Sequence, residues 1–239
     1  MTLASTIALG FLLGMRHATD PDHVAAVTAT VGRERHSRPA AWIGVWWGVG
    51  HTLTIVLVGG AIVLFNWIIQ PRFGLALEFV VGVMLVLVGL GNVAAVRRSD
   101  ATASSRHEAG TAHARTHQTH GTSAARTDRG VVIYNIIRPM AIGVVHGVAG
   151  SAAATLLVMT TIEDPMWAIV YLVVFGAGTM AGMAMITMAI AMPLASFGRR
   201  SPRRHTFIRL ATGFASVALG LFWAYRIAVN EGLFAAVLQ

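Results

Sequence analysis

Long apolar segments alternate with short polar ones along this chain. The apolar segments are residues 3–31, 41–65, 77–96, 131–160, 166–192 and 206–229. Each has about 20 residues or more, the length that an α-helix needs to cross the hydrocarbon core of a bilayer. The pattern predicts an all-α, polytopic membrane protein with six transmembrane helices. The first segment lacks a basic leader, so we expect a retained span and not a cleaved signal peptide.

Composition excludes several classes of protein. Charged residues make up 12% of the chain, about half the share in a soluble domain. The net charge of +8 comes from arginines that lie mostly between the apolar segments, so it indicates topology and not nucleic-acid binding. The chain has no cysteine, which excludes disulfides and thiolate metal sites.

The arginines also predict the orientation. They gather between the first and second, the third and fourth, and the fifth and sixth segments. Loops rich in arginine stay on the cytoplasmic side. We therefore expect a multi-pass protein of the cytoplasmic (inner) membrane with both termini outside.

The two halves of the chain resemble each other at an offset of about 130 residues. The matches are Gly14-x-x-His17 with Gly143-x-x-His146, Trp47-Gly48-Val49-Gly50 with Phe175-Gly176-Ala177-Gly178, and Gly82 and Gly89 with Gly213 and Gly220. Three segments per half make the second copy enter the membrane from the opposite side, as in the inverted repeats of secondary transporters. We expect two three-helix repeats, residues 1–96 and 131–239.

Residues 97–130 are too polar to form a packed core and predict a flexible cytoplasmic linker between the repeats. The segment contains four histidines: His107, His113, His117 and His120. His-rich tracts can collect metal ions, so a linker alone and a linker with weak metal capture both stay open.

The first apolar segment contains the stretch GMRHATDPDHVAAV, which is unusually rich in ionisable groups. His17 falls somewhat past the middle of the predicted span, and Asp20, Asp22 and His23 follow deeper. Each Asp costs about 2.5–3.5 kcal/mol at the centre of a transmembrane helix, so such a cluster normally faces a polar interior and marks an ion path. The alternative is an internally satisfied polar network that only kinks the helix.

Pro21 predicts a break in this first helix. Its ring removes one backbone donor and clashes with the carbonyl of His17, four residues earlier. We expect the break to turn His17, Asp22 and His23 toward one point and to free the His17 carbonyl. Imidazole and carboxylate together suit nickel, cobalt, zinc or iron.

Two further histidines, His51 and His146, fall near the middle of later segments, each flanked by glycine. Each is a candidate ligand or a hydrogen-bonded packing residue, and the match of His146 to His17 favours a ligand. Asn92 is a supporting candidate that either lines the path or joins two helices. Trp47, with Trp42 and Trp46, is typical of an anchor at the membrane interface.

The spacing of His17, Asp22 and His23 reproduces the H-x-x-x-x-D-H signature of the nickel/cobalt transporter family. GVGHTLTIVL, GVVHGVAGSAAATLL and VFGAGTMAGMAMIT resemble the short branch of nickel permeases linked to urease or hydrogenase maturation. The resemblance implies movement of divalent nickel or cobalt, with His17, Asp22 and His23 as metal residues and His51 in support.

We therefore expect a secondary transporter with Ni²⁺ or Co²⁺ as its substrate, without a prosthetic group and not an enzyme. The direction of transport, a metallochaperone partner and the oligomeric state stay open. One alternative is a membrane accessory protein that holds metal for a partner. The other is a membrane metalloenzyme, which usually has more histidines gathered at the cytoplasmic face.

Overall fold

The computed structural model describes residues 3–31, 37–65, 71–109, 124–148, 162, 164–200, 202–231 and 233. Within them, every regular element is a helix. The elements are α1 (Leu3–His17), α2 (Pro21–Val31), α3 (Ser37–Phe65), α4 (Pro71–Ala109), α5 (Ala124–Val148), α7 (Pro165–Arg200), α8 (Pro202–Tyr225) and the π-helix η1 (Arg226–Asn230). The predicted all-α class is confirmed for this part of the chain.

Four stretches of helix in the described residues are long and apolar enough to cross a membrane: Ala40–Phe65, Arg72–Arg98, Pro165–Leu194 and Thr206–Asn230. A shorter apolar helix covers Ile133–Val148. Large apolar side chains such as Leu57, Leu87 and Phe207 are more than half exposed on these helices. A lipid environment accounts for such exposure, and the chain is a multi-pass membrane protein.

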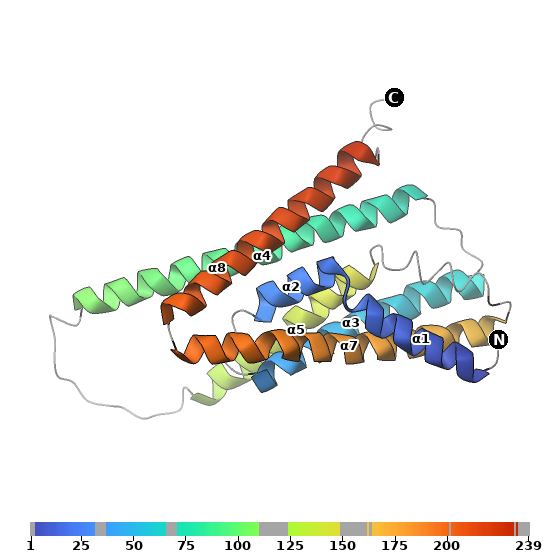
Figure 1. Ribbon diagram of the computed structural model, residues 1–239, viewed down its shortest axis with the longest axis horizontal. Coiled ribbons are helices and arrows are strands. Elements are labelled where there is room, and N and C mark those ends of the chain that lie inside the picture. The colour runs from blue at the N-terminus through green and yellow to red at the C-terminus, as the bar shows by residue number, and fades with distance from the viewer. Residues whose placement is uncertain are drawn as a thin grey trace.

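The helices form two groups, which Figure 1 shows from the side. Helices α1, α3, α5 and α7 make one bundle, in which α3 packs against both α5 and α7, and α1 packs against α7. Helices α4 and α8 pack against each other as a separate antiparallel pair. Helix α2 contacts α4, α8 and α7 and so connects the pair to the bundle.

The predicted break in the first apolar segment is confirmed. Helix α1 ends at His17, and α2 begins at Pro21, the first helical position, where the missing N–H of proline costs no hydrogen bond. The prediction that the His17 carbonyl is freed is wrong, because the Asp20 N–H donates to it at 3.0 Å. The Asp20 carbonyl in turn accepts from the Val24 N–H at 3.0 Å, which starts α2 directly after the turn.

Glycines let the helices of the bundle touch backbone to backbone. A Cβ on Gly14 of α1 would overlap the Phe175 carbonyl oxygen of α7. A Cβ on Gly143 of α5 would overlap the Trp47 carbonyl oxygen of α3. Small residues allow this approach, which holds transmembrane helices together by packing and not by a hydrophobic driving force.

The segment expected to be a linker is partly helical. Helix α4 continues to Ala109, and α5 begins at Ala124. His113, His117 and His120 lie outside the described residues, as does the second part of the predicted fourth span.

Candidate metal centre

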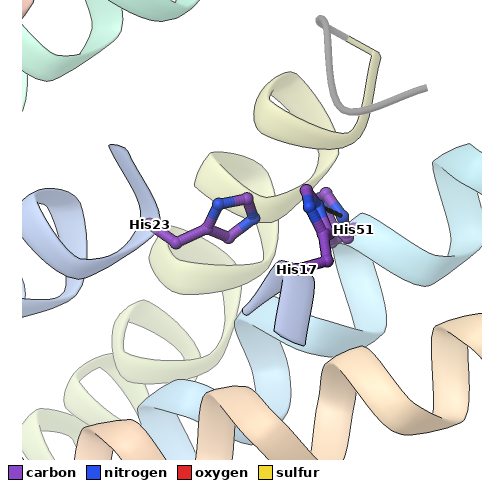
Figure 2. Close-up of side chains that lie close together, drawn as sticks. All are labelled: His17, His23 and His51. Atoms are coloured by element: carbon purple, nitrogen blue, oxygen red, sulfur yellow. Dashed lines mark hydrogen bonds between the residues drawn. The ribbon is translucent and has the colours of Figure 1, made fainter. Parts of the chain in front are cut away.

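Four histidines from four helices meet in the middle of the bundle. His17 is the last residue of α1, His23 lies in the first turn of α2, His51 lies midway along α3, and His146 lies near the end of α5. All four side chains are at most 9% exposed. Figure 2 shows the rings of His17, His23 and His51 turned toward one another. The break between α1 and α2 makes this possible, because it places His17 and His23 on separate helices whose side chains can turn toward the same point.

His17, His23 and His51, here called the His17 group, offer three ring nitrogens within 4.8 Å of one another. The Nε2 atoms of His17 and His51 are 3.2 Å apart. The ring centroids of His17 and His23 are 4.5 Å apart, and those of His23 and His51 are 5.2 Å apart. Ligand atoms at such spacing can hold one metal ion between them.

Asp22, His23 and His146, here called the His146 group, form a second set of this kind. His146 Nε2 lies 3.1 Å from Asp22 Oδ2 and 3.2 Å from His23 Nδ1. His23 Nδ1 lies 3.2 Å from Asp22 Oδ1. His23 therefore belongs to both groups and joins them into one cluster of five side chains.

Several ring nitrogens of the cluster have no hydrogen-bond partner in the described part of the chain. They are His23 Nε2, His51 Nδ1 and His146 Nδ1, all buried. A buried polar atom normally pairs with protein, water or an ion. The donor set of imidazoles and one carboxylate suits a divalent transition metal such as nickel, cobalt or zinc.

Asp20 orients His17 from outside the cluster. Its Oδ2 lies 2.8 Å from His17 Nδ1, and its side chain is about half exposed. When Nδ1 carries the proton and donates to this carboxylate, the lone pair of Nε2 faces the other histidines. Carboxylates fix the tautomer of metal-binding histidines in this way.

Asn92 lies away from the histidines. Its Nδ2 donates to the Arg209 carbonyl at 3.0 Å, which joins α4 to α8. Of the two roles considered for Asn92, hydrogen bonding between helices is the one that the structure shows.

Sequence reasoning missed two aromatic residues at the cluster. Trp47, interpreted as an interface anchor, is fully buried and meets His146 edge-on. That interpretation is wrong. Phe175, which is 3% exposed, stacks on His17. The sequence carried one indirect signal, the match of Trp47 with Phe175 between the two halves.

Comparison with known proteins gives a consistent result. The family model described as "High-affinity nickel-transport protein" matches residues 3–229. A protein of Bacillus sp. (strain TB-90) named "Urease accessory protein UreH" is 36% identical over 235 residues, which cover 97% of this chain and 96% of that protein. A "High-affinity nickel transport protein" of Cupriavidus necator is 34% identical over 71 residues, 29% of this chain and 20% of that protein. No solved structure matches at a significant level.

Proposed function

Because this chain belongs to the NicO family of high-affinity nickel-transport proteins, we propose that it is a permease for Ni²⁺, with Co²⁺ as a second substrate. The ion crosses the cytoplasmic membrane through the bundle. During transport it is bound by His17, Asp22, His23, His51 and His146.

The convergence of these five side chains is the observation that carries the proposal. Asp22 supplies the one carboxylate of the two groups, and its oxygens contact His23 and His146. Neutral imidazoles replace part of the hydration shell of the cation, and the carboxylate balances half of its charge. Donors that are already in place offset part of the cost of removing water from a divalent cation, so a preformed cluster lowers the barrier to entry into the membrane.

We propose further that the chain has six spans in two inverted repeats, residues 1–96 and 131–239, joined by residues 97–130 on the cytoplasmic side. In this arrangement α1 and α2 form one interrupted span. Both termini lie outside.

Reciprocal contacts support this repeat. Gly14 of the first half meets Phe175 of the second, and Gly143 of the second half meets Trp47 of the first. Gly14 matches Gly143 and Phe175 matches Trp47 between the halves. Exchanging the matched residues therefore turns one contact into the other, as twofold symmetry requires. The directions of the helices agree with an inverted repeat, because α5 points opposite to α1 and α7 points opposite to α3 (Figure 1). Two pairs between α4 and α8 also exchange in this way: Gly82 with Gly220 and Gly89 with Gly213.

Transport of a doubly charged ion couples directly to the membrane potential. Each charge that crosses 100 mV gains about 2.3 kcal/mol, so an inside-negative potential of this size favours inward movement of Ni²⁺ by roughly twice that amount. The potential alone is sufficient to drive import against a concentration gradient.

Radiolabelled nickel and cobalt flux in vesicles of both orientations tests the proposal. We expect His17→Ala and Asp22→Asn to abolish flux while the protein still inserts. Two matched controls should transport normally: Asp164→Asn, an exposed carboxylate before α7, and His107→Ala, beyond the apolar part of α4. Normal flux in both cluster variants would overturn the proposed site.

A second candidate function is a membrane accessory protein that holds nickel for a partner. It is favoured by a relative that matches 97% of this chain and whose name describes a urease accessory protein. Purified protein in proteoliposomes separates the two, because a holder binds nickel without moving it into the lumen.

A further inference from the structure

Two buried aromatic rings cover the histidine cluster, one from each half of the chain. The Phe175 ring stacks on the His17 ring, with centroids 5.5 Å apart and planes inclined by 30°. The Trp47 ring meets the His146 ring edge-on, with centroids 6.0 Å apart. Neither aromatic side chain is a metal ligand, so their position calls for another role.

The two rings lie on opposite sides of the cluster along the bundle. Helices α3 and α7 run antiparallel, and the Thr52 hydroxyl of α3 donates to the Gly176 carbonyl of α7 at 3.1 Å. Phe175 is therefore level with the part of α3 that follows His51. Trp47 lies one turn before His51 on α3. Along the direction in which α3 crosses the membrane, the histidines are thus enclosed between Trp47 and Phe175.

Each ring is fixed by the same local construction. Phe175 sits where Gly14 brings α1 against α7, and Trp47 sits where Gly143 brings α5 against α3. Because the backbones touch at these points, a movement of either ring with its helix disturbs the packing of that helix pair. Exposing the cluster requires rotation of the ring or separation of one helix pair.

A second layer of buried side chains lies behind each ring. Tyr171, one turn before Phe175, is 1% exposed, and its ring centroid is 6.2 Å from that of Phe175. Ile43, one turn before Trp47, is 9% exposed. Buried apolar constrictions of this kind exclude water and hydrated ions until they open.

We propose that Trp47 and Phe175 are the two gates of the ion path, and that each closes one side of the histidine cluster. This inference rests on the proposed function for the identity of the ion. It rests on the proposed orientation for the assignment of each gate to a face of the membrane. With α3 beginning at the cytoplasmic face, Trp47 is the inner gate and Phe175 is the outer gate. Opening one ring at a time gives alternating access, and closure of both rings isolates the cluster.

Thiol labelling tests the gates without nickel. The chain has no cysteine, so His51→Cys places a single reporter between the two rings. A membrane-impermeant, charged methanethiosulfonate is applied to right-side-out and to inside-out vesicles. The reporter alone should react slowly from both sides. Adding Phe175→Ala should speed labelling from the outside only, and adding Trp47→Ala from the inside only, each by about tenfold or more.

Matched controls separate gating from general loosening of the bundle. Trp42→Ala on α3 and Trp167→Ala on α7 remove rings at least as large as those of Trp47 and Phe175, but 61% and 40% exposed, and they should leave labelling slow from both sides. Phe175→Tyr and Trp47→Phe keep a ring and should also label slowly. If an alanine variant does not fold, as judged by size-exclusion chromatography, the leucine variant at the same position replaces it.

The gates are overturned if folded ring-deleted variants label no faster than the reporter alone. They are also overturned if both variants open the same side, or if each opens both sides. Side-specific labelling of the reporter variants, combined with no nickel flux by the wild-type protein, would support the gates and contradict the proposed cargo.

Discussion

The Nδ1 atom of His23 lies 3.2 Å from the Nε2 atom of His146, although 123 positions separate the two residues in the chain. His23 belongs to the first half and His146 to the second. The His17 group lies within the first half, whereas the His146 group exists only when the two halves are assembled. Any relative movement of the halves changes the distance between its ligands, which is the coupling that an alternating-access transporter needs.

His23 should matter more for nickel binding than His51. His23 takes part in both the His17 group and the His146 group, whereas His51 takes part in one. His51→Ala leaves Asp22, His23 and His146 in place, so it should weaken binding less than His23→Ala does, by about tenfold or more. Isothermal titration of the purified protein with Ni²⁺ measures the difference. Equal losses would mean that all the ligands act as one indivisible set.

Asp20→Asn should lower nickel affinity by about 10- to 100-fold, the usual effect of removing a group that orients a metal ligand. The amide can still accept from His17 Nδ1, but without a charge it holds the tautomer more weakly. The stability of the protein should change little, because the Asp20 side chain is half exposed. Titration with Ni²⁺ and thermal unfolding in detergent measure the two effects. An unchanged affinity would exclude Asp20 from any part in binding.

Nickel should protect the folded protein against thermal unfolding. A ligand that binds only the native state stabilises it by about 2.7 kcal/mol at a concentration 100 times its Kd. The wild type should show a rise in Tm with Ni²⁺, and His23→Ala should show none. Mg²⁺ serves as the control ion, because it prefers oxygen ligands. A rise of equal size with Mg²⁺ would indicate a nonspecific effect of charge.

Gly143→Ala should destabilise the bundle. The added Cβ would overlap the Trp47 carbonyl oxygen, and overpacking of this kind typically costs about 1–3 kcal/mol. Gly60→Ala on α3 is the matched control, since no atom lies within 4 Å of its added Cβ. Thermal unfolding of both variants in the same detergent gives the comparison. A Gly143→Ala protein as stable as Gly60→Ala would show that α3 and α5 separate without cost.

Asn92→Ala should reduce stability without affecting nickel binding. It removes the hydrogen bond from Asn92 Nδ2 to the Arg209 carbonyl, and hydrogen bonds between transmembrane helices contribute about 0.6 kcal/mol on average. Tm should fall slightly, and the Kd for Ni²⁺ should stay at the wild-type value. A larger Kd for Ni²⁺ would mean that Asn92 contributes to the ion path.

Local features of this protein are determined by its sequence. The lengths of the apolar segments identify a membrane protein, because the thickness of the bilayer sets them. Pro21 marks the break between α1 and α2, because proline acts on the backbone within one turn of itself. His17, Asp22, His23, His51 and His146 were all identifiable as candidates, because ionisable groups are costly in lipid and so stand out against an apolar background.

Only the tertiary structure decided which of these groups meet. Three features depend on side-chain and backbone directions around one turn. They are the division of the ligands into two groups that share His23, the position of Asp20 outside the cluster, and the hydrogen bond that the His17 carbonyl accepts. Trp47 shows the limit most clearly, since a tryptophan has the same local sequence whether it faces lipid headgroups or a buried histidine. Its burial follows from the contact between α3 and α5, residues about 100 positions apart, and contacts of that range leave no local pattern in the chain.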